Sequence, residues 1–441
     1  MTEVDILATA FVTLFGWFAV TYFHRGSDLR ESRLVGAGFA AHVLSAFAQV
    51  WLIYVVYGIG DQMMYMRYGG DLASAMREDF TVVFPEVIRL VLQQDYRLSV
   101  FVPVPGTPVA TMCGLTSLGI LLLGDSIVAV SVLFATAALL GKLALYKGLK
   151  LIFPERLHVW LLLGTLFVPS TVFWSAGILK EAIAMAGLGP MFYGLARLST
   201  GKRSGWAPLV FGTVVVAIVK PYIIMAFAGA AGTAFYWIRS IRDGRVVIRP
   251  VTLIVSMAAA IGATLLVSEF FPRYSIEGLV DETARLQAAG FSGSGGSNYQ
   301  IGDPTIRTFA GQLTFAPFAL ITALYRPFIV EVRNPMMFVS ALETTALLGA
   351  TIWLFVRTRT RDILRSFVTY PGLAFCLAFV VLLGVPVGLT AANLGTLSRY
   401  RIPLVPFQFV LIIGVAATAA VAQRLQTPAL AKPAPLPGGA P

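Results

Sequence analysis

Two groups of ionisable residues stand directly beside apolar runs in this sequence. Asp61 follows such a run in "YGIGDQMMY", and Arg399 and Arg401 precede another in "SRYRIPLVPF". A carboxylate in this position can take a proton from a hydroxyl group or help to hold a divalent cation. A guanidinium group can bind a phosphate through two parallel hydrogen bonds. These residue types therefore indicate phosphate chemistry assisted by a carboxylate, at the edge of an apolar layer.

The two arginines are separated by one residue, and Pro403 follows two positions after Arg401. A proline disfavours a helical backbone before it, and alternate residues of an extended chain point to the same side. The spacing therefore predicts that Arg399 and Arg401 together form a clamp for a diphosphate. The alternative is that both arginines only anchor the chain among lipid headgroups.

Other places in the chain carry the same residue types. Lys180 could meet a phosphate with Glu181 fixing it, and Arg326 stands before a proline with Glu331 five residues later. The structural alternatives are an interfacial Lys–Glu pair, a loop ion pair and, for Asp61, a helix cap. The complete set of candidates is Asp61 as a catalytic base; Lys180, Arg326, Arg399 and Arg401 as phosphate ligands; and Asp71, Glu181, Lys220 and Glu331 as supporting residues.

The composition shows what kind of scaffold must position these residues. Of 441 residues, 57% are hydrophobic and only 12% are charged, and the mean hydropathy is +0.79. Soluble domains carry about twice that charge. The expected fold class is an all-α polytopic membrane protein, and the net charge of +11 suits loops lying against anionic lipid rather than a nucleic-acid site.

The charged loops predict the topology. Runs of apolar residues give about eleven transmembrane helices. The basic segments 24–33, 147–156, 197–203, 239–249 and 357–365 then all fall on the cytoplasmic side, as flanking Lys and Arg usually do. Residues 1–425 form one membrane domain, and the Pro/Ala-rich tail 426–441 is expected to be disordered in the cytoplasm.

Two long segments, 60–125 and 271–335, are expected on the external face. Each contains an apolar stretch too short to cross a bilayer, at 109–123 and 313–325, so two partial or surface helices are predicted. The count of spans also places residues 398–403 outside, against the positive-inside trend. A flexible Gly/Ser stretch at 290–302 is an ordinary loop or a mobile gate.

Other residue types give little indication of a site. Cys113 and Cys376 lie in apolar stretches and predict packing roles, and the three histidines are too scattered to form a metal centre. Glu343 lies within a predicted span and should pair with another buried polar group. No metal ligands are assigned, although a divalent cation beside Asp61 is possible.

The order of these features resembles the GT-C superfamily of integral-membrane glycosyltransferases and the membrane proteins of exopolysaccharide and O-antigen synthesis. The resemblance covers residues 50–422 and is carried by "GDQMMYMRYGGDLA", "LLLGDSIVAVSVLFATAALLGKLALY", "PSTVFWSAGILKEAIAM" and "SRYRIPLVPF". In this family an acidic residue after an early span is catalytic, which corresponds to Asp61. The sequence departs from the family by having no Asp-x-Asp or Glu-x-Asp pair there, so metal dependence does not carry over.

The resemblance implies transfer of a sugar from a polyprenyl-phosphate or polyprenyl-diphosphate donor to a glycan or lipid-linked hydroxyl acceptor. This would occur on the external face of a bacterial inner membrane. Such a reaction needs cations to stabilise the departing phosphate and a base for the acceptor hydroxyl. Two alternatives remain open: a polymerase that moves whole repeat units, and a non-enzymatic transporter or flippase of lipid-linked sugars. A transporter would predict charged groups buried at mid-membrane depth.

Overall fold

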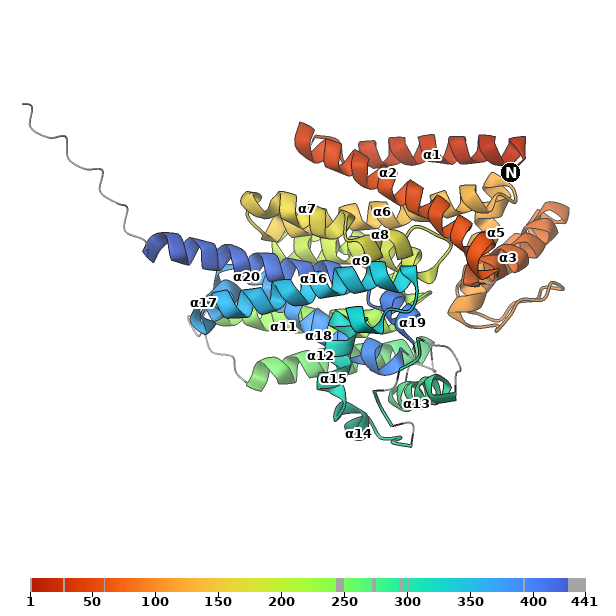
Figure 1. Ribbon diagram of the computed structural model, residues 1–441. Helices are drawn as coiled ribbons and strands as arrows, with labels where there is room; N and C mark the ends of the chain where they lie inside the picture. The colour runs from red at the N-terminus through yellow and green to blue at the C-terminus, as the bar shows by residue number, and fades with distance from the viewer. Residues whose placement is uncertain are drawn as a thin grey trace, which may run out of the picture.

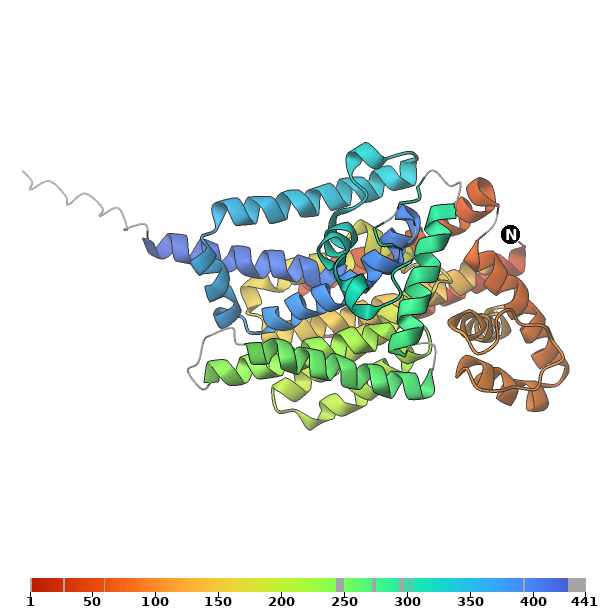
Figure 2. The same cartoon turned by 90° about the horizontal axis from the view of Figure 1, so that it is seen from below.

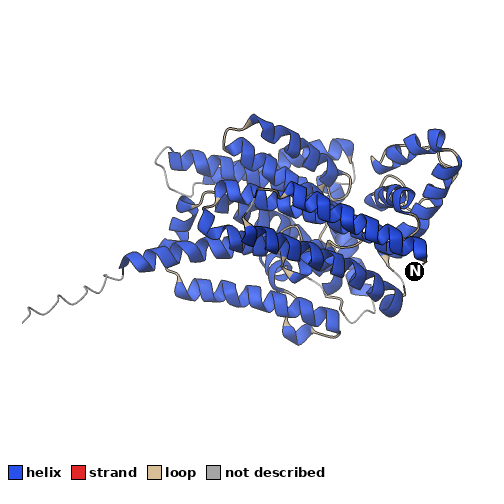
Figure 3. Cartoon of the chain, turned by 90° about the horizontal axis from the view of Figure 1, so that it is seen from above, coloured by secondary structure: helices blue, strands red, loops and turns tan. Residues whose placement is uncertain are grey.

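The computed structural model describes residues 2–426 except 27, 59, 243–249, 272–274, 293–296, 300, 304 and 392. Over these residues the regular structure is helical, and the only β-type pairing is an isolated bridge between Asn298 and Asn393 (Figure 3). The predicted all-α class is therefore confirmed. The predicted tail, 426–441, lies almost wholly outside the described residues, as does part of the Gly/Ser stretch.

The described residues of the first half of the chain form eleven α-helices. They are α1 (Glu3–Phe23), α2 (Leu29–Trp51), α3 (Asp61–Glu78), α4 (Phe80–Val91), α5 (Pro108–Leu123), α6 (Ile127–Ile152), α7 (His158–Leu166), α8 (Pro169–Trp174), α9 (Lys180–Ser199), α10 (Trp206–Ala217) and α11 (Tyr222–Arg242). A π-helical turn, Leu52–Tyr57, continues α2, and short 3-10 turns cover Glu155–Leu157 and Arg203–Gly205.

The second half is more broken. It contains α12 (Pro250–Phe270), α13 (Ile276–Ser292), α14 (Phe309–Leu313), α15 (Ala316–Tyr325), α16 (Pro335–Arg357), α17 (Thr360–Thr369), α18 (Gly372–Thr390), α19 (Leu394–Tyr400) and α20 (Val405–Gln426). A 3-10 turn covers Ile329–Glu331.

Among the residues that the structure describes, five helices are long and apolar enough to cross a membrane: α1, α2 with its π-helical extension, α6, α16 and α18. A sixth is counted if α19 and the first part of α20, which meet at a bend of 68°, form one span. These helices are consistent with a helical membrane protein. The predicted number of about eleven spans is not confirmed in the described part of the chain.

The predicted span at 158–175 is divided into two short helices. Val168 precedes Pro169 and adopts an extended conformation, with φ −63° and ψ 118°. The proline ring disfavours a helical residue before it, so α7 ends and α8 begins anew. Neither α7 nor α8 is long enough to span a bilayer alone.

The helices run roughly along one axis, and the predicted charge distribution maps onto its two ends. In Figure 1 the α1–α2 connection, α17 and the C-terminal end of α20 lie toward the left, whereas the N-terminus, α3 and α19 lie toward the right. We call the second end the N-terminal end of the bundle. That this end faces the cell exterior stays a prediction.

Close helix packing holds the centre of the bundle. Helices α6 and α9 touch through Gly141 and Gly189, where a β-carbon on Gly189 would overlap the Gly141 carbonyl oxygen. The rings of Phe192, Phe375, Phe379 and Phe407 pack against one another nearby, mostly in tilted or edge-to-face contacts, with ring centroids 4.8–5.8 Å apart. Small residues that let backbones approach are what membrane helices use to associate without a strong hydrophobic driving force.

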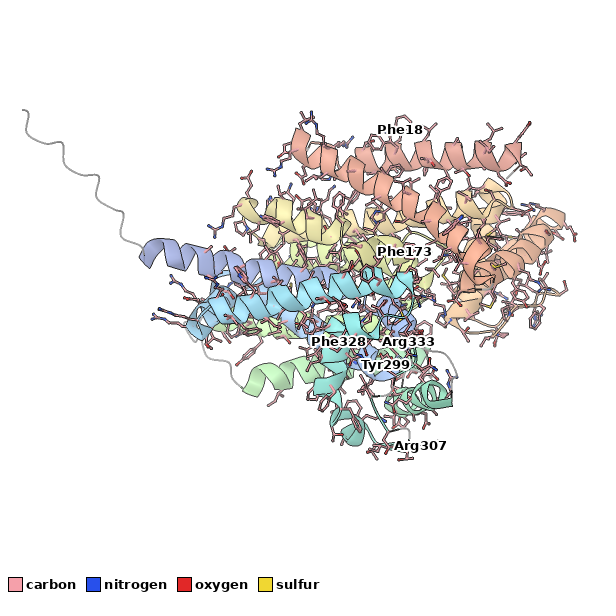
Figure 4. All side chains as sticks on the ribbon, viewed as in Figure 1. Phe18, Phe173, Tyr299, Arg307, Phe328 and Arg333 are labelled. Atoms are coloured by element: carbon pink, nitrogen blue, oxygen red, sulfur yellow. The ribbon has the colours of Figure 1, made fainter. Side chains whose placement is uncertain are left out.

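Helix α1 presents large apolar side chains outward. Phe11, Phe15, Phe18 and Tyr22 are each more than half exposed, and Figure 4 shows Phe18 on the outer side of α1. An apolar surface of this extent is unusual on a soluble monomer. It is the surface expected of a helix that contacts lipid.

Candidate functional site

The first predicted residue, Asp61, opens α3 at the N-terminal end of the bundle. Gly60 is the N-cap, and its extended backbone lets the helix begin at Asp61, whose carboxylate is favoured in the first turn by the helix dipole. The Asp61 Oδ2 atom lies 2.8 Å from the Nη2 atom of Arg399. The Asp61 side chain is 42% exposed, so this carboxylate is open to a ligand.

Arg399 also faces Glu181, the second residue of α9. Its Nη2 atom lies 3.5 Å from Glu181 Oε2, while the other oxygen of Glu181 accepts a hydrogen bond of 2.9 Å from Lys220 Nζ. The Glu181 and Lys220 side chains are 1% and 3% exposed. Lys220 reaches this position because α10 ends at Ala217 and α11 begins only at Tyr222, so the break brings the lysine inward.

Lys180 completes this group. It is the first residue of α9 and is close enough to interact electrostatically with Glu181, Asp61, Lys220 and Arg399. No ion pair involves Lys180 within the described residues. We call Asp61, Lys180, Glu181, Lys220 and Arg399 the open cluster. Three cations and two carboxylates leave it with a net positive charge, which suits an anionic ligand.

Aromatic rings surround the open cluster. The Arg399 guanidinium lies 5.8 Å from the centre of the Trp174 ring, and Lys220 Nζ lies 4.7 Å from that of Tyr400. The buried Tyr65 of α3 is close enough to interact with Asp61. Such rings attract cations by their faces and restrict the motion of the long side chains. The Nε atom of Arg399 is buried and has no hydrogen-bond partner among the described residues.

The predicted clamp of Arg399 and Arg401 does not form. Asn393 caps the chain by accepting a hydrogen bond of 2.8 Å from Thr396, and α19 continues through Tyr400. Arg401 is still in the helical region, with φ −75° and ψ −12°. The prediction of an extended stretch was wrong because Pro403 restricts Ile402, the residue directly before it, and leaves the arginines free to be helical. Two residues apart on a helix, they point to nearly opposite sides.

Arg401 belongs to a second group inside the bundle. Its side chain is 1% exposed and lies 3.3 Å from Glu343, and it donates a hydrogen bond of 3.0 Å to the Arg326 carbonyl oxygen. Glu343 also accepts bonds of 2.7 and 2.6 Å from the backbone and hydroxyl of Ser170. We call Ser170, Glu343 and Arg401 the sealed cluster. It supplies the buried partner that the sequence predicted for Glu343, and it leaves Arg401 unable to reach an external phosphate.

Arg326 and Glu331 form an ion pair with each other, as the structural alternative proposed. The Arg326 guanidinium lies 4.4 Å from the centre of the Tyr299 ring. Partial burial alone would raise the pKa of Glu331, but hydrogen bonds from Arg326 and the Phe328 backbone outweigh it and hold that pKa below its usual range. Tyr299, Phe328 and Arg333 lie in one region of Figure 4. This pair stabilises the loop that leads into α16.

Asp71 is on the surface of α3, ten residues beyond Asp61. At a rise of about 1.5 Å per residue the two lie about 15 Å apart along the helix. No contact in the described part of the chain joins Asp71 to the open cluster. The possible divalent cation also gains no support there, because no three His, Cys, Asp or Glu side chains gather in a metal-binding group among the described residues.

A third polar group, which was not predicted from the sequence, lies inside the bundle. Lys142 of α6 is completely buried; its Nζ atom lies 2.9 Å from His42 Nε2 and donates a bond of 2.6 Å to the Thr171 carbonyl oxygen. Gln49 of α2 donates to the Phe173 carbonyl oxygen and is itself bonded to Gln62. These side chains add donors from α6 and α2 to two carbonyl groups of α8 that also accept hydrogen bonds locally, Thr171 from the Ser175 hydroxyl and Phe173 from the Ala176 backbone.

This third group has a consequence for the open cluster. The segment after α8, Ser175–Leu179, is irregular and buried, and it leads directly into Lys180 and Glu181. Irregular backbone within a membrane protein persists only where other protein groups satisfy it. Lys142 and Gln49 therefore position the turn that leads to Lys180 and Glu181 of the open cluster. A lone Lys within an apolar run was the one feature that could have predicted this role.

Cys113 and Cys376 are buried and free, in agreement with their predicted packing role.

No protein-family model, curated protein or solved structure matches the chain.

Proposed function

We propose that the protein transfers a sugar or glycan from a polyprenyl-phosphate or polyprenyl-diphosphate donor to a hydroxyl acceptor, at the external face of a bacterial inner membrane. The observation that carries this proposal is the position of Arg399, held between Asp61 and Glu181 where α3, α9 and α19 meet. It places a guanidinium and a partly exposed carboxylate side by side. These are the two groups that the reaction requires.

In the proposed reaction the bond between the sugar carbon and the phosphate oxygen breaks, and its electron pair stays on the phosphate. Arg399 and Lys180 stabilise the added negative charge by electrostatic attraction and hydrogen bonds. Asp61 takes the proton of the acceptor hydroxyl while that oxygen forms the new bond to the sugar carbon. Glu181 and Lys220 are buried and paired, so they position Arg399 rather than touch the substrate.

The same geometry serves a donor that carries one sugar or a whole repeat unit. The polymerase version differs only in the size of the glycan that moves. A donor series with one, three and five sugar units distinguishes the two versions, because a polymerase should transfer the longer units as readily as the single sugar.

A transporter of lipid-linked sugars is the second candidate, and a specific observation favours it. Lys142 and the pair of Arg401 and Glu343 are buried inside the bundle. Charged groups at this depth are costly and often mark a pathway through a membrane protein. The bonds of Lys142 to the end of α8 offer a structural reason for its presence, so the transferase remains the first proposal.

The test is a transfer assay in proteoliposomes with a radiolabelled polyprenyl-phosphate sugar and an oligosaccharide acceptor. Asp61→Asn and Arg399→Ala should each lower the transfer rate by about 100-fold or more, the typical size of a general-base or charge-stabilising contribution. Asp71→Asn is the matched control on the same helix and should stay within about two-fold of wild type. Transfer at the wild-type rate in both site variants would overturn the proposal. Movement of labelled lipid between leaflets without a new glycosidic bond would replace it with the transporter.

A further inference from the structure

A further polar site, separate from the three polar groups described above, lies in the loop between α4 and α5. Gln93, Gln94, Asp95, Tyr96, Pro105 and Gly106 line an open pocket of about 540 Å³. This volume is within the range of small-molecule sites. Figure 2 shows the group of orange helices that contains this loop beside the rest of the bundle, at the N-terminal end.

The chemistry of the lining points to hydroxyl groups. Two amides and a carboxylate supply both donors and acceptors, and the Tyr96 ring supplies an aromatic face. None of the six lining residues is cationic, so the pocket offers no positive charge to hold a phosphate. Burial and the neighbouring Cys113 raise the pKa of Tyr96, which keeps the phenol neutral and able to donate.

The loop contains two non-glycine residues with a left-handed backbone and one buried side-chain oxygen without a hydrogen-bond partner in the described part of the chain. Gln93 and Val104 both have positive φ, at 60° and 47°, although neither is a glycine. Strained backbone of this kind concentrates at ligand sites. The Gln93 amide is held by its Nε2 donor, while its buried Oε1 atom has no hydrogen-bond partner among the described residues.

The pocket is joined to the open cluster by Gln93. Its Nε2 atom donates a hydrogen bond of 2.8 Å to the carbonyl oxygen of Ile218 and lies 3.3 Å from the Thr111 hydroxyl. Ile218 is two residues before Lys220, a distance along the chain of at most about 7 Å. A molecule in the pocket would therefore lie near the break between α10 and α11, from which Lys220 reaches Glu181.

We infer that this pocket binds a neutral, hydroxyl-rich carbohydrate, the acceptor glycan of the proposed reaction. The carbohydrate forms hydrogen bonds with the exposed Gln94 and Asp95 and places a sugar face on the ring of Tyr96. The role of this carbohydrate as the acceptor rests on the proposed function. The inference that the pocket binds a carbohydrate rests only on the geometry of the pocket. The glycan is either free or attached to a lipid, and both sources present the same hydroxyl groups.

The experiment measures binding to the full-length protein in nanodiscs by saturation-transfer NMR. The first probe is a panel of neutral oligosaccharides built from glucose, galactose, mannose and N-acetylglucosamine, and the second is a polyprenyl-diphosphate oligosaccharide. At least one panel member should bind, and Asp95→Asn combined with Gln94→Ala should weaken its binding by ten-fold or more. Glu78→Gln, an exposed acidic residue at the end of α3, is the matched control and should not change binding.

The two probes also separate the sources of the glycan. A lipid-linked acceptor predicts tighter binding of the second probe and the same loss in the double variant, whereas a free glycan predicts that only the soluble panel depends on these residues. Absence of binding by every neutral oligosaccharide, or undiminished binding in the double variant, overturns the inference. Arg399→Ala should retain oligosaccharide binding, so loss of transfer with intact binding, or the reverse, tells failure of one proposal from failure of the other.

Discussion

The open cluster and the sealed cluster rest on two arginines that are only two positions apart, Arg399 in the last turn of α19 and Arg401 at its C-cap, and yet they differ in exposure. Arg399 is 23% exposed and shares two carboxylates, one of which is itself 42% exposed. Arg401 is 1% exposed, and its carboxylate partner Glu343 is 6% exposed. Both arginines keep a buried Nε atom with no hydrogen-bond partner among the described residues. Only the open cluster has an exposed carboxylate that a ligand can reach, whereas the buried pair of the sealed cluster stabilises the packing of α8, α16 and α19.

The position of a charged residue along a helix therefore decides its role more than the chemical type of its side chain does. The same guanidinium becomes a candidate phosphate ligand or a structural group after a turn of about 200° around α19. Predictions that remove one group from each cluster should therefore separate stability from activity.

The largest stability effect is expected from Glu343→Ala. It leaves the Arg401 charge buried without its partner, and breaking such a pair costs about 3–5 kcal/mol. Thermal unfolding in detergent should show a large drop in the midpoint, or loss of folded protein. Replacing both residues, as Arg401→Met with Glu343→Leu, should recover most of the stability. A single variant that is as stable as wild type would show that the pair is not sealed.

A smaller loss is expected from Lys142→Met, which removes one of two side-chain donors to the Thr171 carbonyl oxygen; the Ser175 hydroxyl is the other. Loss of a hydrogen bond whose acceptor keeps another partner costs about 0.5–1.5 kcal/mol. If Lys142 positions the turn before Lys180, the variant should also lower transfer activity at temperatures where it remains folded. Lys202→Met, at an exposed position, is the control. Normal stability and normal activity together would contradict the role assigned to Lys142.

Asp61→Asn should have the opposite profile to Glu343→Ala. Its ion pair with Arg399 is partly exposed, and such pairs contribute about 0–1 kcal/mol to stability. The unfolding midpoint should therefore stay near that of wild type while transfer is lost. A strong loss of stability would place Asp61 among the structural residues and remove the contrast between the two clusters.

The smallest effect concerns pH and the pair of Arg326 and Glu331. Because the pKa of Glu331 is held below its ordinary value near 4.5 in the folded protein, the pair stabilises the fold above that pH. The contribution is lost as the pH falls through the folded pKa. Comparing unfolding at pH 7 and pH 4 should show a smaller pH dependence in Glu331→Gln than in wild type. An identical dependence would mean that the pair contributes nothing.

The sequence predicted the helical class, the partial helices near 109–123 and 313–325, and the convergence of Asp61, Glu181 and Arg399. These follow from apolar run lengths and from charges placed at the ends of those runs. It did not predict that 158–175 is divided, because one apolar stretch hides the local effect of Pro169 on Val168. Nor did it predict the separation of Arg399 from Arg401, which depends on the Asn393 cap and on which face of α19 meets which neighbour.

The buried polar residues were the hardest to predict. Lys142 lies in an apolar stretch of α6, and its partners His42 and Thr171 are 100 and 29 residues away in the chain. Only the packing of α2, α6 and α8 brings the three together. The spacing of residues in the sequence cannot predict contacts between residues this far apart in the chain. The pairing of Arg326 with Glu331, which are five residues apart, could be expected.

The most direct test of the central claim is the binding of a polyprenyl phosphate to the two clusters, measured by native mass spectrometry of the protein released from nanodiscs. Arg399→Ala with Lys180→Ala should weaken binding by about 10- to 100-fold, as expected when charge-assisted hydrogen bonds worth about 1.5–3 kcal/mol are removed. The Arg401→Met, Glu343→Leu variant should bind as wild type does. Equal binding by the wild type and the Arg399, Lys180 variant would contradict the claim that the open cluster holds the donor phosphate.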